Sequence, residues 1–241
     1  MGNNARVSVV ACVELEAVEI RYGRLVALRD VTLAVQPGQV LCVRGANGAG
    51  KTTLLRALAG VAQPSQGFRR GPGRVAYVPA ELAPPRLSAG RWLRGIRPRR
   101  SEDPLVALEQ LGFEGDLGRG CRSLSFGNFR KLLLADALSS GADLVVVDEA
   151  NIGLDRAGHR GLGELIAATC ARGATVVAAV QDGEVLHGAD STVVVVDRSV
   201  RRVHSADAND VEIGFSGPSD QIASLLRAAS DLGFRPREDR P

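Results

Sequence analysis

The fold of this chain is decided by the segment Gly45-Ala46-Asn47-Gly48-Ala49-Gly50-Lys51-Thr52. The segment fits the pattern G-x-x-x-x-G-K-[ST], in which a glycine-rich turn joins a strand to a helix. The apolar residues 40–44 before it predict a buried strand, and residues 50–60 have the leucine spacing of a helix. Both flanks therefore favour a phosphate-binding loop over a glycine-rich turn that contains a lysine by chance.

The chemistry of this loop favours a nucleoside triphosphate. Its glycines let backbone N–H groups turn toward phosphate oxygens, and the helix N-terminus adds a partial positive charge. We expect Lys51 to reach the β- and γ-phosphates, the Thr52 hydroxyl to bind Mg²⁺ and Thr53 to contact the α-phosphate. The cradle itself consists of Gly45, Ala46, Asn47, Gly48, Ala49 and Gly50.

A second acidic motif supplies the other half of such a site. The apolar run 144–147 predicts a buried strand, and Asp148 and Glu149 follow it directly. We expect Asp148 to hold Mg²⁺ and Glu149 to orient or deprotonate the attacking water. Without the glycine-rich loop, the pair would be read as an ordinary strand-to-loop junction.

Strands and helices alternate along the chain, which predicts an α/β fold with a mainly parallel sheet. The expected strands are residues 13–21, 31–35, 40–44, 74–78, 144–147, 175–180, 192–197 and 200–204. The expected helices are residues 50–60, 88–96, 104–111, 125–138 and 156–171. Residues 211–215 and 221–232 predict a further strand and an amphipathic helix.

Composition excludes several classes of protein. The 241 residues suit one large domain, or one domain with a small appendage, and the hydrophobic content of 45% suits a globular core. No apolar run approaches the ~20 residues of a membrane helix. A net charge of +3 is too small to indicate nucleic-acid binding. The four cysteines have no metal-binding or redox spacing, so we expect a reduced cytosolic protein.

Arginine dominates the basic residues. Only Lys51 and Lys131 are lysines among the 30 residues of Lys and Arg, an excess that we interpret as composition bias. A lysine at position 51 fits a cradle that a compact ammonium must enter, where arginine is not an equivalent. We interpret Lys131 as an ordinary exposed base.

From about residue 13 to residue 197, the chain resembles the ATP-binding subunits of ATP-binding cassette (ABC) transporters. The decisive similarity is Leu124-Ser125-Phe126-Gly127-Asn128, which resembles the family signature LSGGQ and precedes an apolar helix. Gly153-Leu154-Asp155 is similar to the family's D-loop. Tyr22 occupies the place of the aromatic residue that stacks on adenine, with a half-buried tyrosine at a strand end as the alternative interpretation.

The resemblance implies a P-loop NTPase cassette with a RecA-like core, an N-terminal antiparallel β subdomain and a shortened helical signature subdomain. The cassette would span residues 13–205, with the helical subdomain at about 80–140, and residues 206–241 would form a strand–helix extension with a frayed tail. The implied cofactors are ATP and Mg²⁺. Ser125 and Gly127 would face the γ-phosphate that the other subunit of a head-to-tail dimer binds.

The resemblance also implies the function. The chain would be the ATP-binding subunit of an ABC transporter, coupling ATP binding and hydrolysis to a separate membrane permease. It would therefore lie in the cytoplasm at the inner face of the membrane, as a homodimer or heterodimer of cassettes and without nucleic acid. An exporter is expected by analogy, from the short helical subdomain and the C-terminal extension. A catalytically weak regulatory or heterodimer partner and a soluble non-transport ABC ATPase are the alternatives.

Three positions depart from the family pattern. The family's glutamine that touches Mg²⁺ and the attacking water is Ala80 here, and its histidine that contacts the γ-phosphate is Gln181. Glutamine can donate a hydrogen bond to phosphate but cannot carry a proton. Losing one transition-state donor typically costs about 10²–10³ in rate, so we expect slow hydrolysis at a site served by Glu149, Lys51 and Gln181. Phe126 in place of the first signature glycine is a milder change.

The arginine-rich stretch Arg86–Arg100, with Trp92 inside it, falls in the expected helical subdomain. It is interpreted equally well as a docking surface for an acidic loop of the permease and as a solvated basic face. With Trp92 as its single aromatic residue, it offers no platform for stacking bases.

Overall fold

The structure is a computed structural model that describes residues 11–95, 101–181, 186 and 188–203. The chain divides into two units, Met1–His204 and Ser205–Pro241, and every described residue belongs to the first. The strand and helix expected at residues 211–215 and 221–232 lie outside the described residues. The boundary at residue 205 therefore stays a prediction.

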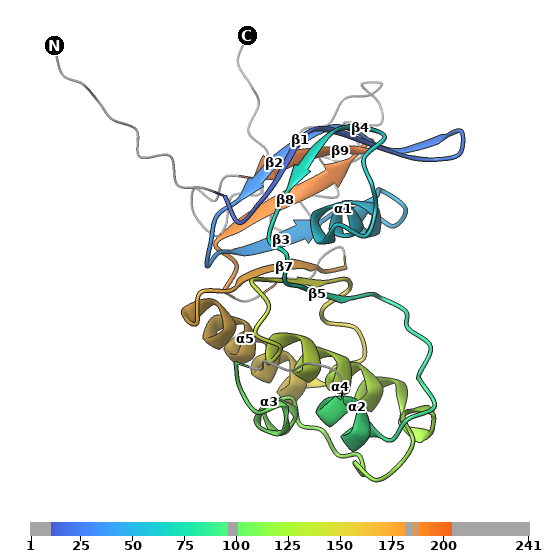
Figure 1. The fold of residues 1–241 in the computed structure, drawn as a ribbon, viewed down its shortest axis with the longest axis vertical. Helices are drawn as coiled ribbons and strands as arrows, with labels where there is room; N and C mark the ends of the chain where they lie inside the picture. Colours follow the sequence, from blue (N-terminus) through green and yellow to red (C-terminus); the bar gives the residue numbers. More distant parts are fainter. Residues whose placement is uncertain (1–10, 96–100, 182–185, 187, 204–241) are drawn as a thin grey trace, which may run out of the picture. The chain divides into compact units, whose positions relative to one another are not determined.

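A six-stranded sheet with the order β5-β6-β7-β3-β8-β9 forms the centre of the first unit (Figure 1). Its strands are β3 (Val40–Arg44), β5 (Val75–Val78), β6 (Leu144–Val147), β7 (Thr175–Ala179), β8 (Ser191–Val196) and β9 (Ser199–Val203). Neighbouring strands from β5 to β8 are parallel, and β9 closes the edge antiparallel to β8. Along β3, Leu41 and Val43 face one hydrophobic cluster, whereas Val40 and Cys42 face the other. Burial on both faces explains why these strands read as continuous apolar runs.

A three-stranded antiparallel sheet with the order β2-β1-β4 covers one side, which confirms the expected N-terminal β subdomain. Its strands are β1 (Val13–Tyr22), β2 (Leu25–Val35) and β4 (Gln66–Arg70). The sequence did not predict β4, because QGFRR is polar and its Phe68 side chain is exposed. A side chain on Gly67 would meet the Ala17 carbonyl oxygen at 2.3 Å, so a glycine permits the close approach of β4 to β1.

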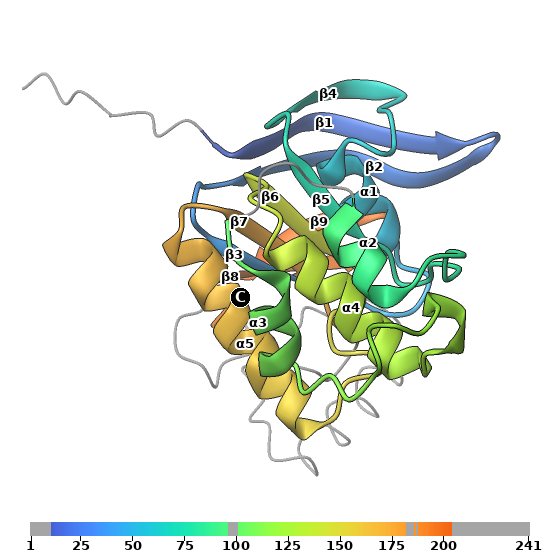
Figure 2. The ribbon, with the colours of Figure 1, turned by 60° about the horizontal axis from the view of Figure 1, so that its bottom comes forward.

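The helices lie on opposite faces of the six-stranded sheet (Figure 1). Helix α1 (Lys51–Ala59) lies between the two sheets, where Leu54, Leu55 and Leu58 share a hydrophobic cluster with β1, β2 and β3. The other helices form a layer on the opposite face, which Figure 2 turns toward the viewer. They are α2 (Ala89–Gly95), α3 (Pro104–Gln110), α4 (Phe126–Leu138) and α5 (Arg156–Ala171), with a 3₁₀ turn at Cys121–Ser123.

Helix α4 is the most deeply buried of these helices. Every residue from Phe129 to Leu138 is buried, and the Ser125 hydroxyl caps the helix by accepting a hydrogen bond from the Asn128 N–H at 3.2 Å. Within the part of the chain that the structure describes, no helix combines the length and hydropathy needed to cross a membrane.

Candidate nucleotide-binding site

The strand register brings the predicted site residues to one edge of the six-stranded sheet. Val43 of β3 pairs with Ala179 of β7, so the register places Gln181 level with Gly45. Val78 of β5 pairs with Val147 of β6, and the same continuation places Ala80 level with Glu149. Ligands of open α/β sheets bind at this carboxyl edge. Segments far apart in sequence therefore meet where the phosphate-binding loop begins.

The glycine-rich loop needs glycine at two of its tightest points. Gly45 has φ +143°, and a side chain there would meet the Val195 carbonyl oxygen at 2.5 Å. Gly50, with φ +114°, precedes α1, and a side chain there would lie 3.1 Å from the Ala27 carbonyl oxygen. The loop is therefore held between β8 and the β1–β2 hairpin, with its backbone curled ahead of the N-terminus of α1.

Gly45→Ala is expected to lower the free energy of unfolding more than Gly48→Ala. Both positions have positive φ, where alanine costs of order 1–3 kcal/mol. Only at Gly45 does the new methyl group also meet backbone, because Gly48 has open space around it. We expect overpacking to add about 1–3 kcal/mol to the loss for Gly45→Ala. Urea unfolding without nucleotide measures both variants, and equal losses would contradict this description of the loop.

Lys51 lies inside the loop. Its side chain is buried, and its Nζ donates hydrogen bonds to the carbonyl oxygens of Gly45 at 2.6 Å and Ala46 at 3.2 Å. Thr52 and Thr53 follow in the first turn of α1, both half-buried. The positive charge and two hydroxyl groups are thus gathered at the start of the helix, where an anion is favoured.

Asp148 has the environment of a cation ligand. Its side chain is 1% exposed, and no group in the described residues donates a hydrogen bond to either carboxylate oxygen. Its backbone N–H donates to the Val78 carbonyl oxygen at 2.8 Å, which fixes it at the end of β6. A buried carboxylate without a partner is costly unless it pairs or binds a metal. Asp148, with the Thr52 hydroxyl, therefore fits Mg²⁺, a cation that prefers oxygen ligands.

The signature and D-loop residues contact each other within the chain. Phe126 is 58% exposed, and a side chain on Gly153 would meet its ring at 2.8 Å. A side chain on Gly127 would meet the Gly153 carbonyl oxygen at 2.6 Å. The aromatic ring that replaces the first signature glycine therefore covers the D-loop. Ser125 stands just before them as the cap of α4.

Tyr22 lies at the end of β1, beside the turn of the β1–β2 hairpin, and its side chain is 47% exposed. Tyr22 pairs with Leu25 across the hairpin. Two residues further along β2, the Ala27 carbonyl oxygen lies against Gly50 of the glycine-rich loop. The hydroxyl groups of Tyr77 and Tyr22 near the Arg56 guanidinium of α1 raise the pKa of Arg56. The hairpin thus brings an exposed aromatic ring to the region where an adenine ring is expected.

Two basic side chains of α4 differ from the sequence interpretation. Lys131 is buried rather than an ordinary exposed base, because its Nζ donates to the Gly112 carbonyl oxygen and to Asp155. Arg130 was not singled out at all, although it is among the largest fully buried side chains. The one sequence feature that could have indicated the burial of Arg130 is its place beside a lysine in an otherwise apolar stretch of helix. Such a pair is more often solvated, as long charged side chains usually keep their heads in water.

The fold and this edge of the sheet define a P-loop nucleoside triphosphatase. The protein-family profile described as ABC transporter matches residues 28–151. The "Zinc import ATP-binding protein ZnuC" of Pseudomonas aeruginosa (strain UCBPP-PA14) is 36% identical over 196 residues, which cover 79% of this chain and 73% of that protein. The chain belongs to the family of ABC transporter ATP-binding subunits, whose cassettes bind and hydrolyse ATP.

Solved structures share the fold. One described as an "ATP binding subunit of ABC transporter" has a TM-score of 0.70 at 22% identity and covers 90% of this chain and 93% of its own. A dimeric ATP-binding cassette in a post-hydrolysis state, bound to ADP and Pi, also has a TM-score of 0.70, at 19% identity, and covers 79% and 97%. The expected P-loop cassette fold is confirmed.

Proposed function

We propose that this chain binds Mg-ATP at the carboxyl edge of its six-stranded sheet and hydrolyses it slowly to drive a separate permease. The observation that carries the proposal is the buried, unpartnered carboxylate of Asp148 at the same sheet edge as the glycine-rich loop. A phosphate cradle and a carboxylate suited to a cation are the two halves of an ATP site.

Each residue has a distinct task in this proposal. Lys51 and the loop N–H groups bind and orient the phosphates. Asp148 and Thr52 hold Mg²⁺, which neutralises charge on the phosphate oxygens when bound. Glu149 accepts a proton from the attacking water, and Gln181 donates a hydrogen bond toward the γ-phosphate.

We expect slow steady-state hydrolysis at saturating Mg-ATP and a faster Gln181→His variant. Ala80 has no polar side chain and Gln181 cannot carry a proton, so two contacts to the water and γ-phosphate are weakened. Losing one transition-state donor costs about 10²–10³ in rate, and histidine at position 181 adds a side chain that can carry a proton. Gln181→Ala serves as the matched control and should be slower than the unmodified protein. A turnover like that of an ordinary cassette, or no gain for Gln181→His, would contradict the proposal.

We further infer that the transporter imports its substrate and that a metal ion is the substrate class. This inference is supported by the similarity to zinc import ATP-binding proteins of Pseudomonas aeruginosa and of Cereibacter sphaeroides, the latter 36% identical over 75% of this chain. The exporter expected by analogy has no such support. Uptake of radiolabelled zinc by cells with and without the gene tests the direction. Unchanged uptake together with faster efflux in the cells that carry the gene would restore the export alternative.

The proposed partners are a membrane permease, through which the chain reaches the membrane, and a second cassette. Arg86, Arg91 and Arg94 are exposed in and before α2 and offer a basic surface to an acidic permease loop. Residues 96–100 of the arginine-rich stretch lie outside the described residues. The alternative role, a weak cassette that supports a competent partner, is favoured by Ala80 and Gln181. Hydrolysis that rises only when a partner cassette is co-expressed would select this alternative.

A further inference from the structure

Arg130 connects the signature helix to the ends of two core strands. Its side chain is 2% exposed and its Nη1 donates to the Pro79 carbonyl oxygen at 2.6 Å, directly before Ala80. Its Nη2 donates to the carbonyl oxygens of Asp148 and, at 3.0 Å, of Glu149. One guanidinium of α4 thus bonds the segments that follow β5 and β6.

The backbone that Arg130 holds is strained. Glu149 has φ +50°, in the left-handed region, which costs of order 1–2 kcal/mol for a residue with a side chain. On the far side, the Ala150 N–H donates to the Ala179 carbonyl oxygen at 2.8 Å. The conformation that sets the direction of the Glu149 side chain is therefore fixed from α4 on one side and from β7 on the other.

The environment of Arg130 indicates that these contacts matter to the fold. Burial lowers its pKa to about 10, although the charges of Asp148 and Glu149 act to raise it. A buried guanidinium is unfavourable unless its hydrogen bonds offset the lost hydration. Three backbone carbonyl groups provide such bonds to Nη1 and Nη2, whereas Nε has no hydrogen-bond partner among the described residues.

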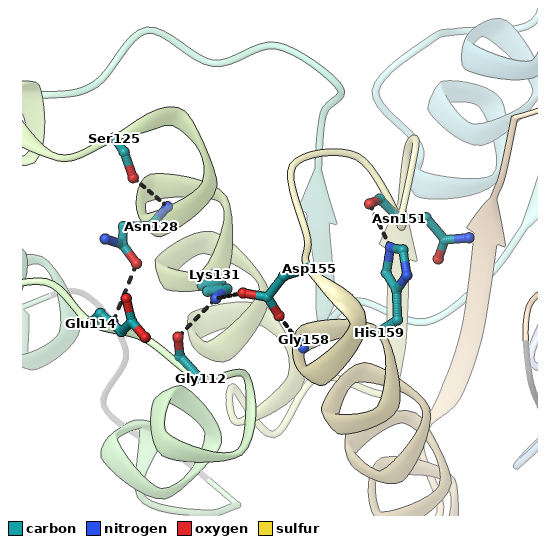
Figure 3. A network of polar contacts seen from close by, with 9 residues as sticks. All are labelled: Gly112, Glu114, Ser125, Asn128, Lys131, Asn151, Asp155, Gly158 and His159. Carbon is teal, nitrogen blue, oxygen red and sulfur yellow. Dashed lines mark hydrogen bonds and ion pairs between the residues drawn. The ribbon is translucent and has the colours of Figure 1, made fainter.

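Lys131, the next residue, holds the other end of the same loop (Figure 3). Its Nζ donates to Asp155 Oδ2 at 2.9 Å and to the Gly112 carbonyl oxygen at 2.7 Å. Asp155 in turn caps α5 by accepting from the Gly158 N–H at 2.7 Å. Midway along the loop, His159 Nε2 bonds the Asn151 carbonyl oxygen at 3.0 Å. The loop 148–155 is thus anchored at both ends and in its middle.

We propose that Arg130 and Lys131 are positioning residues, which hold the loop 148–155 so that Glu149 meets the attacking water in a fixed orientation. The inference rests on the proposed ATP site. The hydrogen bond from Arg130 to the Pro79 carbonyl oxygen also anchors the segment that contains Ala80, the position of the family's glutamine. The Ala80 side chain itself can form no hydrogen bond there. The helix that begins at the signature therefore sets the geometry of its own chain's hydrolytic residues.

Single-turnover hydrolysis of radiolabelled ATP by Arg130→Met, which keeps an unbranched apolar stem and loses every donor, tests the proposal. A displacement of about 1 Å can cost 10²-fold, so we expect the hydrolysis rate to fall at least about tenfold. We expect the KM and nucleotide affinity to change less than about threefold, because the phosphate cradle is untouched. Arg130→Gln, with two N–H donors, should recover part of the rate, and Arg160→Met, at an exposed arginine of α5, should equal the unmodified protein.

Amide hydrogen exchange supplies a second measurement that does not depend on activity. In Lys131→Met, exchange at the amides of residues 150–155 should accelerate, while exchange in β3 and α1 stays unchanged. If Arg130→Met does not fold, Arg130→Gln and Lys131→Met carry the test. An unchanged rate in Arg130→Met, a loss confined to nucleotide affinity, or unchanged exchange in Lys131→Met would overturn the inference. An unmodified protein that neither binds nor hydrolyses ATP would instead overturn the proposed function.

Discussion

Lys51→Met is expected to weaken ATP binding by about 10- to 100-fold, which corresponds to the 1.5–3 kcal/mol typical of hydrogen bonds to a charged group. The ammonium lies within the glycine-rich loop, bonded to the Gly45 and Ala46 carbonyl oxygens. Methionine has similar length and no charge, so it removes the one cation that the loop itself provides. Titration with a fluorescent ATP analogue measures the change.

The chain offers a matched control for this variant, because its only other lysine is also buried and bonded to a backbone carbonyl. Lys131→Met removes an ammonium of the same kind at a distance from the phosphate cradle. Both variants should lower the melting temperature, but only Lys51→Met should lose ATP affinity. Lys51→Arg should also bind weakly, because the planar guanidinium does not replace a compact ammonium. Equal ATP affinity in Lys51→Met and Lys131→Met would remove Lys51 from the site.

The parts of the fold that could be predicted from the sequence are those with a strong local signal. Strands β3 and β6 were predicted with their observed ends because both faces are buried, so the apolar run and the strand coincide. Helix α1 was predicted at residues 50–60 from its leucine spacing, and it spans Lys51–Ala59 because Gly50 and Gly60 cap its ends. In these segments, local sequence and tertiary environment agree.

The parts that the sequence did not predict depend on a neighbour rather than on local pattern. Strand β4 is polar and exists because β1 offers a free edge, which no periodicity in QGFRR reveals. The burial of Arg130 and Lys131 depends on carbonyl groups that other segments bring to α4. A sequence shows that a side chain carries a charge, but not which distant carbonyl oxygens will surround it.

The candidate site divides in the same way. The identities of Lys51, Asp148 and Glu149 follow from motif chemistry, whereas the left-handed backbone of Glu149 has no signal in its residue type. Glutamate is not a residue that favours positive φ, so its conformation must be imposed by contacts from α4 and β7. The motif therefore predicts which groups perform the chemistry, and the structure adds what holds them in place.

Glu149→Gln is expected to lower the rate of ATP hydrolysis by about 10²–10⁴, the usual contribution of a general base. Glutamine has the same shape but cannot accept the proton of the attacking water. The loop and Asp148 are unchanged, so ATP affinity should stay within about threefold of the unmodified protein, and a complex with intact ATP should accumulate. Single-turnover hydrolysis and equilibrium binding, measured on the same preparation, separate the two effects.

Glu81→Gln is the matched control, because Glu81 is an exposed carboxylate in the segment that follows β5, next to Ala80. Glu81 is a second carboxylate near this sheet edge that could take over water activation. If Glu149 is the base, Glu81→Gln should hydrolyse ATP at the unmodified rate and the double variant should be no slower than Glu149→Gln. If instead Glu81→Gln loses the activity and Glu149→Gln keeps it, Glu81 is the general base. The strained backbone of Glu149 would then shape the loop without a role in water activation.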